Sequence, residues 1–220
     1  MPRLIKVSAV PACWSILLAA AGRAADQTPA ELAAALQRKI DQVTDFSADF
    51  VHTYQGGVLR KKLTERGRVA VKKPGRMRWD YTAPERKEFV SDGSRMYFYI
   101  PADKQVIISP VPAEGEATTP ALFLAGKGRL TSEFTPSFID LPPGLPAGSR
   151  VLKLVPNVKQ PDYDWLVLAV DPNSLAIRGL MTVDAQGGTS TFAFSNLKEN
   201  AGLADNQFAF KIPRGVDIVD

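Results

Sequence analysis

The feature that most limits the fold of this chain is a side-chain alternation with a period of two residues, which runs through most of the sequence from Phe46 onward. Short alternating segments of this kind are typical of β-strands with one buried face. Turn pairs such as Pro74-Gly75 and Asp92-Gly93 give hairpin-length connections between them. We therefore expect one antiparallel sheet of about 10–11 strands. The segments lie at about 46–54, 63–72, 77–81, 87–90, 95–100, 105–109, 150–155, 164–171, 176–183 and 189–197.

A sheet of this size curls because its strands are twisted, and curling creates a concave face. Several segments are apolar on both faces, which indicates that something covers them. Residues 28–43 and the short apolar segment 119–126 each begin with Thr-Pro, and both are predicted helices. They could lie as a lid over an apolar cavity on the concave side, or could complete a core that has no cavity. The alternation alone leaves both arrangements open.

The N-terminus has the layout of a secretory signal peptide, with basic Arg3 and Lys6, an apolar run at 7–21 and small residues up to Ala25. The run is shorter than the roughly 20 residues of a membrane-spanning helix. We expect cleavage after Ala24, giving a signal peptide at 1–24 and a single exported domain at 25–220. Cleavage removes three basic residues and no acid, so the net charge falls from +4 to +1. Acylation of Cys13 is the alternative, which the nearby Pro11 disfavours.

The scarcity of Cys and His excludes several kinds of chemistry. One Cys and one His cannot supply a Cys/His metal cluster, so no metal site is expected. His52 lies in a strand, and Asp49 points to the opposite face, so His52 is predicted to be half-buried without a catalytic carboxylate. The sequence contains no serine-hydrolase elbow and no phosphate-binding loop, and Asp162 and Asp164 lie beside a turn. A protein without enzymatic activity or cofactors is predicted.

Basic residues are densest between positions 60 and 78. They could form a surface that docks an acidic partner or lipid head groups, or they could be a solvated outer face of the sheet. The export signal disfavours nucleic acid as a partner. The candidate docking residues are Arg60, Lys61, Lys62, Arg76 and Arg78.

A set of motifs follows a characteristic order along the chain. The motifs are Phe46-Ser47-Ala48-Asp49-Phe50, Val71-Lys72-Lys73-Pro74-Gly75-Arg76-Met77-Arg78-Trp79-Asp80-Tyr81, Val90-Ser91-Asp92-Gly93, Thr119-Pro120 and Pro213-Arg214-Gly215-Val216. In these motifs and their order the chain resembles the LolA family of periplasmic outer-membrane lipoprotein carrier proteins. The resemblance implies an incomplete antiparallel β-barrel curled around a hydrophobic cavity, with short helices as its lid.

The resemblance also implies roles for particular residues. Lys73 occupies the position before the turn proline at which the family usually has Arg, and there it would hold the lid shut. The Lys ammonium is a point charge, whereas the Arg guanidinium is planar and can donate several hydrogen bonds at once, so the latch would be weaker or differently built. The residues implied to line the acyl-chain cavity are Leu36, Ile40, Phe50, Met77, Trp79, Leu122 and Phe123.

The function implied by the resemblance is that of a soluble, monomeric periplasmic carrier. Such a protein takes lipid-modified proteins from an ATP-driven inner-membrane release complex, shelters their acyl chains and delivers them to an outer-membrane receptor. Two alternatives remain open at the level of sequence. One is a receptor anchored by Cys13, or another lipid-binding protein on the same fold. The other is a periplasmic hydrolase, for which the sequence shows no catalytic residues.

Overall fold

The computed structural model describes residues 27–58, 61–111, 124 and 128–219. The signal segment with Cys13, and the predicted helix at 119–126 apart from Leu124, lie outside the described residues. Within these ranges the chain forms one 12-stranded sheet, in the order β12-β6-β5-β4-β3-β2-β1-β11-β10-β9-β8-β7. All neighbouring strands are antiparallel except β12, which pairs with β6 in parallel.

The helical segments are α1 (Pro29–Gln42), α3 (Leu130–Glu133) and the 3-10 helix η1 (Asp205–Phe208). The strands are β1 (Asp45–Gln55), β2 (Lys62–Lys72), β3 (Arg76–Ala83), β4 (Lys87–Asp92), β5 (Arg95–Ile100), β6 (Gln105–Pro110), β7 (Phe134–Phe138), β8 (Arg150–Pro156), β9 (Trp165–Val170), β10 (Ile177–Val183), β11 (Thr189–Glu199) and β12 (Asp217–Val219).

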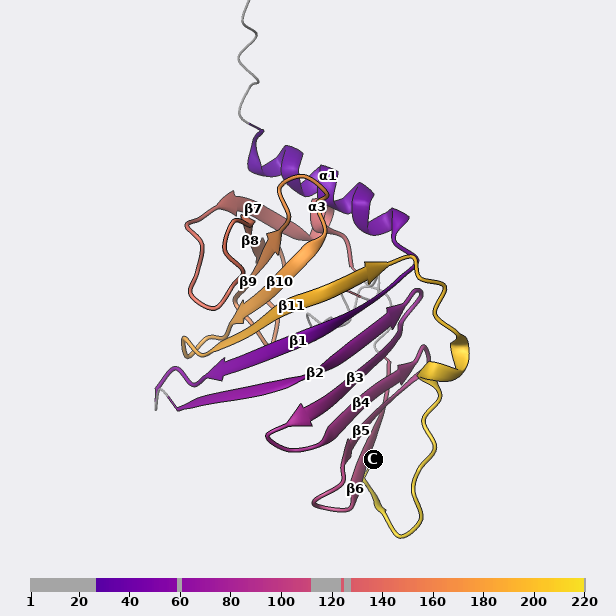
Figure 1. Cartoon of the computed structure of the whole chain (residues 1–220). Coiled ribbons are helices and arrows are strands. Elements are labelled where there is room, and N and C mark those ends of the chain that lie inside the picture. Colours follow the sequence, from indigo (N-terminus) through magenta and orange to yellow (C-terminus); the bar gives the residue numbers. More distant parts are fainter. Residues whose placement is uncertain (1–26, 59–60, 112–123, 125–127, 220) are drawn as a thin grey trace, which may run out of the picture.

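The sheet curls without closing, because its edge strands β7 and β12 do not pair with each other (Figure 1). The predicted incomplete barrel is therefore confirmed. The prediction missed two of its strands, β7 and β12. A proline interrupts the short strand β7, and β12 consists of three exposed residues, so neither displays an alternation of buried and exposed side chains.

Helix α1 begins directly after its N-cap Thr28, as the Thr-Pro start predicts, and a capping box closes its first turn. The Thr28 side chain accepts a hydrogen bond from the Glu31 backbone N–H, and the Glu31 carboxylate accepts one from the Thr28 N–H. The helix packs against α3, β7 and β8, over the half of the sheet that ends in β7 (Figure 1). Gln37 ties it to α3 by accepting a hydrogen bond from the Leu130 backbone N–H at 2.8 Å. No helix in the described ranges is long and apolar enough to cross a membrane.

Strands β8, β9 and β10 are buried on both faces. Their inner side chains join the main core, while Val151, Val167 and Met181 form a second apolar cluster on the outer face. A proline-rich loop at residues 141–147, between β7 and β8, covers this cluster through Leu145. It comes so close to β10 that a Cβ at Gly179 would lie 2.6 Å from a Leu145 methyl group. The predicted cover over these strands is thus present, and a loop provides it.

Candidate functional site

The inner face of the sheet carries one large apolar cluster beneath α1. All five described members of the predicted cavity set are buried there, with Leu36 and Met77 fully inaccessible to solvent. Leu122 and Phe123 lie outside the described residues. The structure therefore gathers the five on one side of the sheet, from α1, β1 and β3. They are Leu36, Ile40, Phe50, Met77 and Trp79.

An apolar pocket of about 40 Å³ remains at the C-terminal end of α1. Around it, the described side chains of the inner face pack against one another in the main apolar cluster. An apolar ligand larger than this pocket would have to displace α1 or the side chains beneath it. Among the described residues of the predicted cavity set, Ile40 alone lines this pocket. The described residues of the lining are Lys39, Ile40, Val43, Phe46, Lys73, Leu124, Leu175, Ile177, Phe194, Leu197 and Glu199.

Most of the pocket lining comes from residues that the sequence did not single out. Phe194 and Leu197 lie on β11, which pairs directly with β1 although the two strands are at opposite ends of the chain. The alternation from 189 to 197 was the available signal, because it contains Phe192 and Phe194 on a common face. Their position next to β1 could not be read from a local pattern.

Aromatic rings from two strands, β1 and β11, pack around Trp79 in the inner cluster. Its ring centroid lies 5.2 Å from that of Phe50 and 5.1 Å from that of Phe192, both in edge-on geometry. The indole Nε1 is buried and has no hydrogen-bond partner within the described part of the chain. Leaving a buried donor unpaired costs about 1–3 kcal/mol. As far as the structure describes the chain, Trp79 Nε1 is therefore an unsatisfied donor within the apolar inner cluster.

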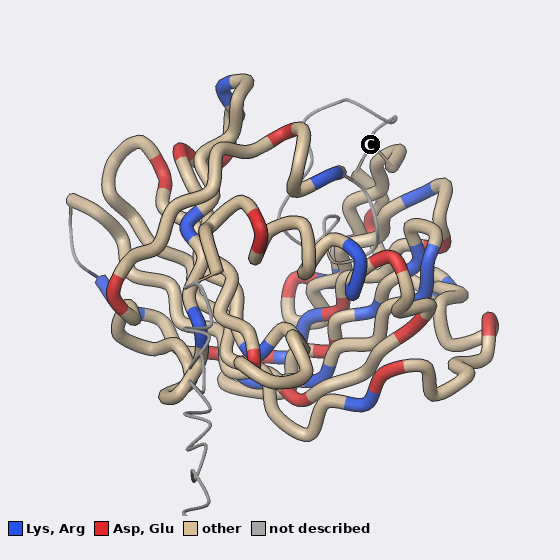
Figure 2. Tube along the Cα trace, turned by 90° about the horizontal axis from the view of Figure 1, so that it is seen from above, with Lys and Arg blue, Asp and Glu red and all other residues tan. Residues whose placement is uncertain are grey.

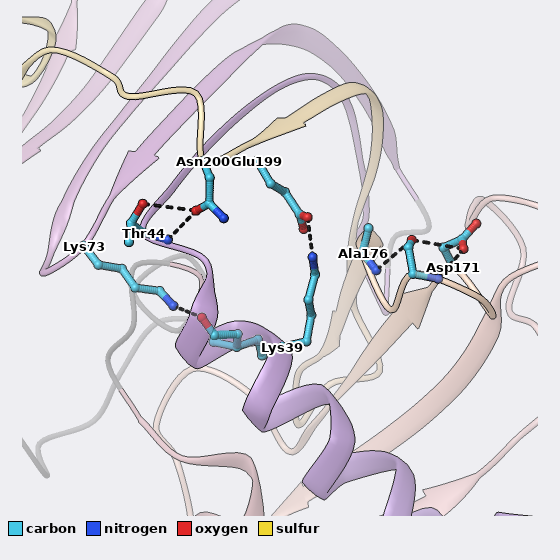
Figure 3. A network of polar contacts seen from close by, with 9 residues as sticks. Lys39, Thr44, Lys73, Asp171, Ala176, Glu199 and Asn200 are labelled. Carbon is cyan, nitrogen blue, oxygen red and sulfur yellow. Dashed lines mark hydrogen bonds and ion pairs between the residues drawn. The ribbon is translucent and has the colours of Figure 1, made fainter.

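Lys73 contacts α1, as Figure 3 shows. Its Nζ donates a hydrogen bond to the Ile40 carbonyl in the last turn of α1, where a cation also complements the helix dipole. Burial lowers the pKa of Lys73 below its usual range, although the charge of Asp41 opposes that shift. The residue predicted to act as a latch thus lies at the junction between α1 and the β2–β3 turn, with its charge partly desolvated.

Two further contacts hold the same end of α1, on the side of β11 (Figure 3). The Lys39 ammonium lies 2.5 Å from the Glu199 carboxylate, and both line the apolar pocket. Beyond the helix, the Thr44 backbone N–H donates to the Asn200 side chain at 2.8 Å. The partners in each pair are more than 150 positions apart in sequence, so no local motif indicates them.

The predicted docking residues do not form one surface. Lys62 and Lys72 mark the two ends of β2, about 33 Å apart in an extended strand. Lys61 and Lys62 therefore lie far from Arg76, which pairs with Lys72 across the β2–β3 turn. Arg60 lies outside the described residues.

The predicted docking residues on β3, Arg76 and Arg78, have acidic neighbours. Arg76 contacts Asp205 at 2.6 Å, while Arg78 contacts Asp80 at 2.9 Å and Glu88 at 2.5 Å. Figure 2 shows positive and negative positions interspersed over the strands. The described basic residues between 61 and 78 therefore do not form a continuous patch, because acids on β3, β4 and η1 offset part of their charge.

His52 is half-buried, as predicted, but the expectation that no carboxylate reaches it is wrong. Glu65 lies directly opposite on β2, and its carboxylate is 3.0 Å from His52 Nδ1. The other ring nitrogen is 2.8 Å from the Ser190 hydroxyl, and Lys87 also contacts Glu65. Burial lowers the pKa of His52, although the bond to Glu65 opposes this shift. The hairpin register of β1 and β2 was the signal that could have located this partner.

Comparison with known proteins places these features in a family. Residues 41–211 match the family model described as outer membrane lipoprotein carrier protein LolA. An outer-membrane lipoprotein carrier protein of Chromobacterium violaceum is 30% identical over 222 aligned residues, covering 94% of this chain and 97% of that protein. Its counterpart from Methylococcus capsulatus is 28% identical over 185 residues, covering 84% and 86% respectively.

A solved structure supports the fold independently. An uncharacterized conserved protein of Thermus thermophilus superposes with a TM-score of 0.52 at 14% sequence identity, covering 85% of this chain and 98% of that one. The family model covers most of the chain, and the first strand, the Lys73 turn and the inner aromatic cluster all lie within the matched range. This chain belongs to the LolA family of outer-membrane lipoprotein carrier proteins.

Proposed function

We propose that this protein is a periplasmic carrier that shelters the acyl chains of lipoproteins on the inner face of its sheet and moves them from the inner to the outer membrane. The observation that carries the proposal is the apolar inner cluster covered by α1, whose C-terminal end is held by the polar contacts of Lys73 and Lys39. Family membership supplies the cargo class, since the named relatives are lipoprotein carriers.

The energetics suit a carrier that must also release its cargo. About 15 buried methylenes of one acyl chain are worth about 12 kcal/mol. Displacing α1 exposes Leu32, Leu36 and Ile40, each worth about 1.5–3 kcal/mol when buried, so undocking costs about 5–9 kcal/mol. The cost of undocking α1 thereby offsets a large part of the free energy gained by burying one acyl chain.

Specific roles follow from this proposal. The five buried residues of the predicted cavity set, together with Leu122 and Phe123, would contact acyl chains once α1 has moved, and Lys73 would act as the latch. An inner-membrane release complex and an outer-membrane receptor would be the donor and the acceptor of cargo. Residues 1–24 would direct export and then be removed, and chemical catalysis plays no part in the cycle.

The test is native mass spectrometry of the protein purified from the periplasm of its own host. The expected result is a population bound to an acylated protein, released when that protein's acyl groups are removed enzymatically. The mature N-terminus is measured in the same spectra, and a free Ala25 is expected. An acylated Cys13 would favour an anchored receptor, and a preparation with no acylated protein bound would refute the carrier function.

A further inference from the structure

We propose that the indole N–H of Trp79 is a specific donor for the carbonyl oxygen of an ester or amide that joins an acyl chain to its head group. The site would then prefer acylated ligands over alkyl ethers or plain hydrocarbons of the same length. This inference rests on the proposed carrier function and defines which part of the ligand the inner face recognises.

The first observation is that Trp79 lies deep in the core with its polar atom unused. The side chain projects from β3 into the inner cluster and is only 3% exposed. Its Nε1 has no acceptor in the described ranges, and the nearest rings, those of Phe50, Phe192 and Phe194, offer none. Buried indole N–H groups usually have a partner.

Trp79 differs from the other unpaired groups of the structure. The remaining buried atoms without a partner in the described ranges are Ser149 Oγ and Gln160 Oε1. Both belong to partly exposed residues outside the inner cluster, where small movements give access to water. The described neighbours of Trp79 are apolar side chains of the inner cluster, which cannot accept its hydrogen bond, whereas a ligand that carries an acceptor could.

The second observation connects Trp79 with the pocket at the end of α1. Phe194 lines that pocket, and its ring centroid is 6.3 Å from that of Trp79. Within the described residues, the Phe194 ring thus lies in contact with both the pocket and the indole. An acyl chain that displaces Phe194 and extends the pocket inward brings its carbonyl within reach of the donor.

The surroundings also select the type of acceptor. The rings packed against Trp79 are uncharged, so an anionic acceptor brought to this position would be desolvated without a counterion. A neutral carbonyl accepts the hydrogen bond at a much smaller cost of burial. Ester and amide carbonyls are the neutral acceptors that acyl chains carry, whereas an ether oxygen accepts more weakly and a methylene does not accept.

The experiment compares two lipids that differ in one carbonyl. A 1-acyl lysophosphatidylcholine and its 1-alkyl ether analogue, with equal chain lengths, are titrated into wild-type protein and into two variants. Trp79→Phe removes the N–H and keeps an aromatic ring. Trp165→Phe is the matched control, because Trp165 lies on the outer face in the second apolar cluster, with Lys153 Nζ 4.3 Å from its ring centroid.

We expect wild type and Trp165→Phe to bind the ester about tenfold more tightly than the ether, a difference of about 1.4 kcal/mol. The Trp79→Phe variant should bind both equally. In wild-type protein, the Trp79 indole proton resonance should move downfield with the ester and not with the ether. This last measurement needs no variant and stands even if Trp79→Phe folds poorly.

Several results would overturn the inference. They are equal affinities of wild type for the two lipids, an unmoved indole resonance, or a full ester preference in Trp79→Phe. In each of these cases lipid binding itself persists, so the carrier proposal survives. Wild-type protein that binds neither lipid would overturn both proposals.

Discussion

Lys73 offers the most direct test of how α1 is held over the sheet. Replacing it by Met keeps a long apolar stem and removes the ammonium that donates to the Ile40 carbonyl. A hydrogen bond from a charged group contributes about 1.5–3 kcal/mol, and a cation at a helix C-terminus adds about 0.3–1 kcal/mol. Burial of the ammonium, which lowers the pKa of Lys73, opposes both terms. We expect a net loss of about 1.4 kcal/mol of closure free energy in Lys73→Met.

Amide hydrogen exchange across α1 measures this loss. A change of about 1.4 kcal/mol makes opening about tenfold more frequent. The amides at the C-terminal end of α1 should therefore exchange about ten times faster in Lys73→Met, while those of the central strands β1 and β2 keep their rates. Lys62→Met is the matched control, because Lys62 is an exposed lysine at the far end of β2.

The residue that the family usually has at this position gives the opposite test. Lys73→Arg introduces a planar fork that can donate two hydrogen bonds to carbonyls at the end of α1, so α1 should exchange more slowly than in wild type. Equal exchange of α1 in wild type, Lys73→Met and Lys73→Arg would refute the latch. Equal acceleration in Lys73→Met and Lys62→Met would point to a general effect of charge.

Three further predictions concern the core and its polar groups. Met77→Asp places a carboxylate at a position with no solvent access, so it should lower the unfolding free energy by more than about 3 kcal/mol. The volume-conserving Met77→Leu should lower it by less than about 1.5 kcal/mol. Urea titrations measure both changes. Gly67→Ala should lower the melting temperature strongly, because the new Cβ would lie 2.1 Å from the Asp80 carbonyl oxygen. At Gly187 a Cβ has no described atom within 4 Å, so Gly187→Ala should lower the melting temperature only through the strain of its φ of +75°. His52 has a lowered pKa in the folded protein, so its contribution to stability is present above pH 6.5, the pKa of an unperturbed His, and is lost as the pH falls toward the folded-state value. His52→Gln should flatten the fall in urea midpoint between pH 7 and pH 5, and an unchanged slope would contradict this assignment.

The parts of the fold that follow from local chemistry could be predicted from the sequence. Alternation located ten strands, and the Thr28-Pro29 pair located the start of α1, because strand periodicity and helix starts depend on residues close together in the chain. Strand β12 has no such signal, since it is short and its side chains are exposed.

The polar contacts of the site depend on which strands become neighbours. His52 and Glu65 meet because of the register of one hairpin, which the turn at Gly56-Gly57 could in principle have indicated. Lys39 and Glu199 meet only because β11 returns to pair with β1, and this pairing is a property of the whole fold. The same pairing places Phe194 in the pocket, which is why sequence analysis located the inner face and missed most of the pocket lining.

The unpaired indole and the small pocket bear on the same physical problem, which is how a protein binds acyl chains tightly enough to shelter them and loosely enough to pass them on. Packing of α1 on the inner face reduces the binding free energy of every apolar chain by a similar amount, because the same helix side chains must be displaced each time. An unsatisfied N–H at Trp79 acts differently, since only a ligand with an acceptor removes its cost. The helix would therefore set the affinity, while Trp79 would set the selectivity. The two properties should be separable, so that Lys73→Met raises the affinity for ester and ether lipids alike, while Trp79→Phe lowers the affinity for the ester lipid and leaves that for the ether unchanged.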